Sequence, residues 1–190
     1  MIVAYNRTMV RFVAFLRAIN VGGHVVKMDR LRAEFEGMGL SSVETFIASG
    51  NVIFETKARD VARLEKSIEK RLRTALGYDV ATFLRSTTDL AAVAHFQAFP
   101  QQELEVEGHA LYIAFLPRPL DREAERKLMA LRSEVDDFRV RDREIYYLIR
   151  TRFSESRFSG ALLERTLGMP STMRNVTTVR KLAAKYPPPV

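Results

Sequence analysis

The sequence predicts an α+β protein that contains two ferredoxin-like β-α-β-β-α units and an extra C-terminal helix. The first observation is an internal similarity: Phe12-Val13-Ala14-Phe15-Leu16 resembles Tyr112-Ile113-Ala114-Phe115-Leu116. The second is that a loop and a segment of helical apolar spacing follow each copy. We therefore expect a duplicated unit, with Phe15 and Phe115 at equivalent positions of the two copies.

These patterns divide the chain into five segments. They are an N-terminal extension (1–8), a first ferredoxin-like unit (9–86), a connector (87–108), a second ferredoxin-like unit (109–170), and a C-terminal helix with a tail (171–190).

The first unit begins with a run over 10–16 that is apolar on both faces, as expected of a central strand. Paired glycines, Gly22 and Gly23, end it in a loop, and a helix of period 3.6 follows until Gly39. Two β-rich runs, 43–48 and 52–56, surround Ser49-Gly50-Asn51. This spacing predicts a hairpin with a two-residue type II′ turn, in which Ser49, Gly50 and Asn51 have a structural role.

The second helix of this unit has the clearest pattern in the chain. Apolar residues recur at steps of three and four over 61–76, Asp60 is suited to the N-cap, and Gly77 follows the end. Glu69 and Arg73 are spaced to form an ion pair on the exposed side. We expect Glu65, Glu69, Glu123 and Glu125 on solvated helix faces, which gives no reason to assign an acid/base pair. A strand over 79–85 completes the unit.

The second unit shows the same order at first. A strand over 109–116, a helix after Asp121, two strands within 138–149 and a helix ending at Gly168 follow the connector. Where the first unit has its fourth strand, residues 175–186 show helical spacing instead. The second copy is therefore expected to be edited, with a helix in place of that strand.

Composition restricts the classes of function. The chain has 190 residues, a net charge of +7, 47% hydrophobic residues and no cysteine. Cysteine chemistry and disulfides are excluded, which agrees with a reducing compartment. Since no apolar run approaches the ~18 residues of a membrane span, we expect a cytoplasmic protein without a membrane partner. The positive charge favours nucleic acid, phosphorylated metabolites or other anions as partners.

Three segments together resemble one bacterial family, the domain-of-unknown-function family 1697. They are Phe15-Leu16-Arg17-Ala18-Ile19-Asn20-Val21-Gly22-Gly23, then Ala48-Ser49-Gly50-Asn51-Val52-Ile53-Phe54, and finally Gly168-Met169-Pro170-Ser171-Thr172-Met173-Arg174-Asn175 with Thr178-Val179-Arg180-Lys181-Leu182. The resemblance covers about residues 9–186. It implies a small α+β protein of two ferredoxin-like halves and no established activity.

The candidate site is an anion-binding site with two parts. The glycine loop contributes Arg17, Asn20, Gly22, Gly23 and Lys27, because backbone N–H groups between a strand and a helix can hold an anion. The second part is a stripe of the expected C-terminal helix with Arg174, Thr178 and Lys181, spaced at four and three residues. A simple turn and a solvated basic face are the alternatives for the two parts.

Other chemistries lack support in the sequence. Neither the GxxxxGK[ST] phosphate loop nor GxGxxG is present, so no nucleotide cofactor is predicted. His24, His95 and His109 have no ligand-like spacing, so no metal site is predicted.

Three hypotheses of function remain. The first is binding of a phosphate-bearing partner, with nucleic acid ahead of a small metabolite. The second is an enzyme that acts on a phosphorylated small molecule. The third is a protein-interaction module or homo-oligomer whose open sheet edges pair with another copy.

Overall fold

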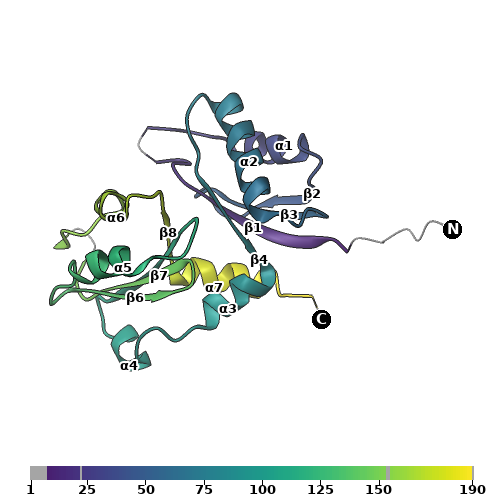
Figure 1. Ribbon diagram of the computed structural model, residues 1–190. Helices are drawn as coiled ribbons and strands as arrows, with labels where there is room; N and C mark the ends of the chain where they lie inside the picture. Colours follow the sequence, from purple (N-terminus) through teal and green to yellow (C-terminus); the bar gives the residue numbers. More distant parts are fainter. Residues whose placement is uncertain (1–7, 22, 153–154, 190) are drawn as a thin grey trace. The chain divides into compact units, whose positions relative to one another are not determined.

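The computed structural model describes residues 8–21, 23–152 and 155–189. Within these ranges it is an α+β fold with two four-stranded antiparallel sheets and seven helices (Figure 1). The chain divides into two compact units, residues 1–87 and 88–190. None of the helices in the described ranges has both the length and the apolar character that a membrane span requires.

In the first unit, the strands form one sheet in the order β2-β3-β1-β4, and α1 and α2 lie on one face of it (Figure 1). The elements are β1 (Val10–Leu16), α1 (Met28–Glu36), β2 (Ser41–Thr45), β3 (Asn51–Thr56), α2 (Val61–Leu76) and β4 (Thr82–Ser86). Leu31, Phe35, Leu64, Ile68 and Leu72 bury the apolar stripes of the two helices against Phe12, Ala14, Leu16, Val52, Phe54 and Leu84 of the sheet.

In the second unit, the strand order is β6-β7-β5-β8. The elements are α3 (Thr87–His95), α4 (Gln101–Leu104), β5 (Ala110–Phe115), α5 (Arg122–Met129), β6 (Asp136–Arg141), β7 (Glu144–Ile149), α6 (Gly160–Leu167), β8 (Thr172–Asn175) and α7 (Val176–Lys185). Helices α5 and α6 cover one face of the sheet and α3 and α7 the other (Figure 1). Neighbouring tyrosines of β7 show these two faces: Tyr147 belongs to the core under α5 and α6, whereas the Tyr146 hydroxyl donates to the Val93 carbonyl of α3.

The two sheets have matching topologies. Phe15 of β1 pairs with Asn51 and Phe83, and Phe115 of β5 occupies the same place in its own sheet, between Glu144 and Thr172. The expected equivalence of Phe15 and Phe115 is therefore met. This arrangement is consistent with duplicated β-α units.

The expectation of an edited second copy is wrong at its fourth strand. Residues Thr172–Asn175 form β8 and pair with β5, so the place taken by β4 in the first sheet is filled. The extra C-terminal helix is present, but it begins at Val176, after Asn175 caps it by accepting from the Thr177 N–H at 2.8 Å. Helix α3 likewise follows β4 directly, so both fourth strands lead into a helix.

The prediction of a two-residue hairpin turn is also wrong. Strand β2 ends at Thr45 and β3 begins at Asn51, so residues 46–50 form a longer loop. The buried Asn51 closes it: its side chain donates to the Phe46 carbonyl at 3.1 Å, and its carbonyl accepts from the Phe46 N–H at 2.9 Å. Gly50 has a φ of +72°, and a Cβ there would lie 2.8 Å from Cβ of Ile19.

Helix α2 has the expected caps but not the expected ion pair. Asp60 accepts from the Arg63 N–H at 2.9 Å, and Gly77 ends the helix at a φ of +84°. Glu69 does not pair with Arg73 but accepts from the Thr82 N–H at 2.9 Å, and Glu65, 8% exposed, accepts from the Leu84 N–H at 2.8 Å. Both carboxylates thus bind the outward N–H groups of edge strand β4.

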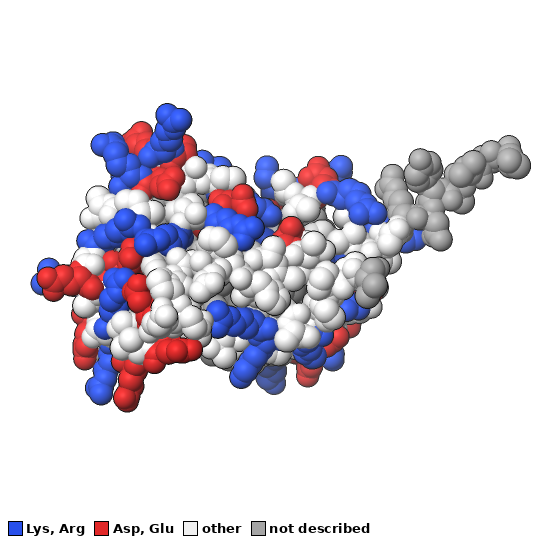
Figure 2. All heavy atoms as spheres, turned by 90° about the horizontal axis from the view of Figure 1, so that it is seen from below, with Lys and Arg blue, Asp and Glu red and all other residues white. Residues whose placement is uncertain are grey.

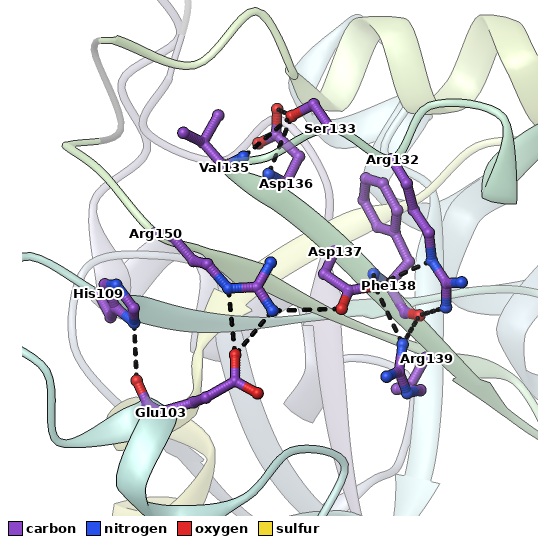
Figure 3. A network of polar contacts seen from close by, with 10 residues as sticks. All are labelled: Glu103, His109, Arg132, Ser133, Val135, Asp136, Asp137, Phe138, Arg139 and Arg150. Carbon is purple, nitrogen blue, oxygen red and sulfur yellow. Dashed lines mark hydrogen bonds and ion pairs between the residues drawn. The ribbon is translucent and has the colours of Figure 1, made fainter.

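Side chains cover the outer backbone groups of edge strand β6 as well (Figure 3). Asp137 accepts from the Phe138 N–H at 2.8 Å, and the Phe138 carbonyl accepts from Arg132 and Arg139 at 2.8 and 3.0 Å. Arg150 links Asp137 to Glu103. Burial alone would raise the pKa of Asp137, but the Phe138 N–H and the three arginines lower it below its ordinary value.

The edge strands of the two sheets are protected in different ways. Within the described residues, β4 and β6 have side-chain partners at outward backbone groups, and Glu164 accepts from the Ser171 N–H beside β8. In strand β2 the regular pairing pattern is interrupted between Ser41 and Glu44, where Ser42 has a φ of +50°. Such features are the usual protection of sheets against edge pairing, which weakens the hypothesis of edge-mediated assembly.

The first prediction concerns Gly50. Replacing it by Ala should lower the free energy of unfolding by about 2 to 4 kcal/mol, because left-handed strain and a clash with Ile19 add together. Gly39→Ala is the matched control, since Gly39 has a φ of +76° and open space where a Cβ would lie; it should cost only about 1 kcal/mol. Urea unfolding of both variants measures the difference, and equal losses would contradict the close approach.

The second prediction concerns Glu65. Glu65→Ala should destabilise the fold by about 1 to 3 kcal/mol, because the buried Leu84 N–H loses its acceptor, whereas Glu65→Gln retains an acceptor and should cost less. Glu123→Ala is the control, since Glu123 is exposed and, among the residues that the structure describes, pairs with Lys127 on its own helix. Urea unfolding with amide exchange at Leu84 tests this; unchanged exchange in Glu65→Ala would refute the role in edge protection.

Candidate anion-binding surface

The loop after β1 is held by Asn20. Its side-chain N–H donates to the Ala48 carbonyl at 2.9 Å, and its side-chain oxygen accepts from the Val26 N–H at 2.7 Å. Asn20 also has a φ of +56°, which asparagine tolerates better than most residues. The side-chain N–H of Asn20 thus joins the loop to residues 46–50, and its side-chain oxygen closes the loop onto Val26, a structural role that the sequence did not suggest.

The two joined loops combine backbone strain with exposed apolar side chains. Ala18 and Ile47 have φ values of +61° and +51°, which are unfavourable for residues with a Cβ. Val21, Val25 and Ile47 are 58%, 88% and 54% exposed. Residues held in this way are found preferentially at functional sites.

The other loop residues of the predicted site differ in accessibility. Arg17 is half-buried, and its backbone N–H donates to the Ala81 carbonyl at 2.9 Å. Gly23 and Lys27 are exposed, and Lys27 forms the N-cap of α1 without a side-chain capping bond. Gly22 lies outside the described residues. Nearby, the His24 ring stacks on Tyr78 with centroids 3.8 Å apart, and burial raises the pKa of Tyr78.

The C-terminal part of the predicted site needs a correction. Arg174 is not on the helix but on β8, where it is 9% exposed. Its guanidinium donates to the Thr172 hydroxyl at 2.8 Å and to the Met173 carbonyl at 2.9 Å, and burial lowers its pKa to about 10. Thr178 and Lys181 do lie on α7, half-buried and exposed respectively. The expected helical stripe therefore loses Arg174.

The two parts of the predicted site belong to different units, the loop to residues 1–87 and the C-terminal residues to 88–190. Their joint action on one anion remains a prediction.

A positive surface that the sequence analysis missed follows one side of α2. We define the basic face as Arg59, Arg63, Lys66, Lys70 and Arg73, all of them exposed. Steps of three and four bring the four members on α2 to one side of the helix, and Arg59 lies just before the helix begins. Arg73 pairs with Asp79 at 3.3 Å, whereas Arg63, Lys66 and Lys70 form no ion pair within the described part of the chain.

Within the described residues, the middle of the basic face, formed by Arg63, Lys66 and Lys70, has no acidic partner because of where the acidic side chains of α2 point. Glu65 and Glu69 bind the backbone of β4, and Asp60 caps the first turn, so none of the three is free to neutralise Lys66 or Lys70. Like charges three and four residues apart destabilise a helix by about 0.2 to 0.5 kcal/mol per pair. An anion along this face would remove that cost.

A cavity of about 530 Å³ lies at the N-terminal end of the basic face. Its lining includes Arg59, Asp60, Arg63 and Ser67. The Ser67 hydroxyl donates to the Arg63 carbonyl at 2.9 Å, and Arg59 donates to the Thr8 carbonyl at 3.3 Å. The guanidinium groups of Arg59 and Arg63 suit a phosphate group, which arginine binds with paired hydrogen bonds, while Asp60 already caps the helix N-terminus.

Charge is distributed unequally between the units. Residues 1–87 contain 14 basic and 9 acidic side chains, and residues 88–190 contain 16 and 14. On the face drawn in Figure 2, Lys and Arg side chains lie among Asp and Glu side chains. The positive excess is therefore concentrated in the first unit, where α2 lies.

The described residues give no support to a metal site. Among them, no three His, Asp or Glu side chains form a group that would hold a metal ion. His95 and His109 contact the carbonyls of Ala91 and Glu103.

Comparison with known proteins gives the family and the fold. The model of a family described as "Protein of unknown function (DUF1697)" matches residues 9–146. A solved structure, that of the conserved bacterial protein SP0830 from Streptococcus pneumoniae, is similar with a TM-score of 0.73 and 24% sequence identity. The similarity covers 93% of this chain and 98% of that one. No curated protein compared with the chain matches it.

Proposed function

The chain belongs to the DUF1697 family, and from its own surface we propose that it binds the phosphate backbone of nucleic acid through the basic face of α2. The observation that carries this proposal is the inward orientation of Glu65 and Glu69, which leaves Arg63, Lys66 and Lys70 without acidic neighbours on the exposed side. We propose binding without catalysis, in the cytoplasm, where nucleic acid is accessible.

The spacing of the cations supports a polymer over a single small anion. A helix rises about 1.5 Å per residue, so Arg63 and Lys70 are about 10 Å apart along its axis. One phosphate does not span this distance, whereas a nucleic-acid strand presents several in a row. A phosphorylated metabolite bound in the cavity at Arg59 and Arg63 is the second candidate, because a cavity of about 530 Å³ is large enough for a small molecule.

The glycine loop, and Thr178 and Lys181 of the predicted C-terminal stripe, remain a proposed second contact with the phosphate groups. Lys27 and Lys181 are its accessible cations. An enzyme that uses this loop to hold a phosphate remains the alternative function. The cavity at Arg59 and Arg63 includes no residue of this loop.

We also propose that each unit is a ferredoxin-like fold and that the two arose by duplication. The shared strand order and the matched places of Phe15 and Phe115 support this.

The third prediction tests the basic face. Binding to a mixed-sequence DNA duplex should weaken steeply with salt, and each lost phosphate contact should reduce the slope of log K against log salt by about 0.9. The triple variant Arg63→Ala, Lys66→Ala, Lys70→Ala should therefore lose about 2 to 3 of that slope, while alanine preserves the helix. Fluorescence anisotropy over a salt series measures both.

The matched control removes the same charge from α5, through Arg122→Ala, Arg126→Ala and Lys127→Ala. If net charge alone drove binding, both triple variants would weaken it equally, and the assignment to α2 would be wrong. A Lys27→Ala, Lys181→Ala variant in the same titration tests the second contact. Titration with inorganic phosphate and ATP separates the metabolite from the polymer, because a metabolite site would bind ATP as tightly as DNA.

A further inference from the structure

The second unit contains a cavity of about 500 Å³ on a different part of its surface. The cavity lies where the loop before β6 meets the segment that leads into α6, and its apolar lining consists of Leu131, Val135, Phe158 and Leu162. This volume is within the range of small-molecule sites, which combine apolar walls with a few polar groups.

The buried charged residue in the lining of this cavity is Asp136, which is 5% exposed. One carboxylate oxygen, Oδ1, accepts from the Tyr147 hydroxyl at 2.7 Å and from the Ser156 hydroxyl at 2.8 Å. The other, Oδ2, accepts from the Ser133 hydroxyl at 3.0 Å (Figure 3). Three hydroxyl groups thus converge on one carboxylate.

The directions of these hydrogen bonds are fixed by the backbone. The Ser133 oxygen accepts from the Asp136 N–H at 3.0 Å, and the Ser156 oxygen accepts from the Phe158 N–H at 2.9 Å. Both hydroxyl protons are therefore left to point at the carboxylate. Burial raises the pKa of Tyr147, so its hydroxyl also remains a donor at neutral pH.

Hydroxyl groups stabilise the carboxylate but do not neutralise it. Within the described residues, Asp136 forms no ion pair with Lys or Arg, and a buried charge without a counter-charge is unfavourable. From the part of the chain that the structure describes, Oδ2 accepts one hydrogen bond, which leaves it acceptor capacity. The remaining charged lining residues are Glu134, Glu155 and Arg157, so the cavity is negative overall.

We propose that this cavity binds a small organic amine, whose ammonium group pairs with Asp136 and whose apolar body contacts Phe158 and Leu162. The ammonium supplies the missing counter-charge and an N–H donor for Oδ2, and the apolar walls remove the body of the ligand from water. This site shares no residue with the basic face of α2 and favours the opposite charge.

Three ligands of similar shape test the proposal: 2-phenylethylamine, 2-phenylethanol and 3-phenylpropionate. Titrations followed by NMR should show the amine shifting the amide signals of Val135, Asp136 and Phe158, with at least tenfold tighter binding than the alcohol. Because Arg157 also lines the cavity, 3-phenylpropionate is the critical competitor. Equal or tighter binding of this carboxylate, or no binding of the amine, would overturn the proposal.

Two variants connect binding to the cavity. Asp136→Asn retains the shape of the side chain and should abolish the preference for the amine over the alcohol. Should Asp136→Asn fail to fold, Leu162→Trp remains as a test. The larger side chain fills the apolar part of the cavity and should weaken binding of the amine at least tenfold. The α2 triple variant is the control and should bind the amine normally. Amine binding that survives Leu162→Trp in the folded protein would place the site elsewhere.

Discussion

The two hydrogen bonds that Glu65 and Glu69 of α2 accept from the outer N–H groups of β4 are the interaction on which the first unit depends. An edge strand must satisfy its outward backbone donors, and a carboxylate accepts from a backbone N–H more strongly than a neutral group does. Forming these bonds fixes the rotation of α2 about its own axis. With that rotation fixed, Leu64, Ile68 and Leu72 enter the core, and Arg63, Lys66 and Lys70 face solvent.

The second unit uses the same device with a different result. Glu164 of α6 accepts from the Ser171 N–H next to β8, as Glu69 does for Thr82 in the first unit. Helix α6, which holds the place of α2 in this unit, however, has a single basic residue, Arg165. The shared topology therefore does not produce a shared electrostatic surface, because a basic face also needs a row of cations on the exposed side of the helix.

Sequence periodicity was sufficient for most elements but not for those set by long-range contacts. Helix α2 has local signals for its start, its end and its apolar stripe, so all three could be predicted. Strand β8 could not, because four residues before a helix give no period, and its pairing with β5 depends on a distant strand. The prediction placed Arg174 on a helix for the same reason. The basic face was missed for a related reason. Glu69 is four residues before Arg73, and this spacing by itself predicts an ion pair within the helix. Its actual partner, the Thr82 N–H of β4, is distant in the sequence and can be identified only once the fold is known.

The two proposed binding surfaces follow from one rule about buried and exposed carboxylates. On α2, the carboxylates bind backbone N–H groups of the sheet, and the neighbouring cations remain exposed. At β6, the carboxylate of Asp136 is buried and binds hydroxyl groups instead of a cation. Where the acidic groups bind the backbone, the remaining surface favours anions. Burying one among neutral donors next to a cavity leaves a site that favours a cation. Because the two sites share no residue and prefer opposite charges, a ligand of one is not expected to compete at the other.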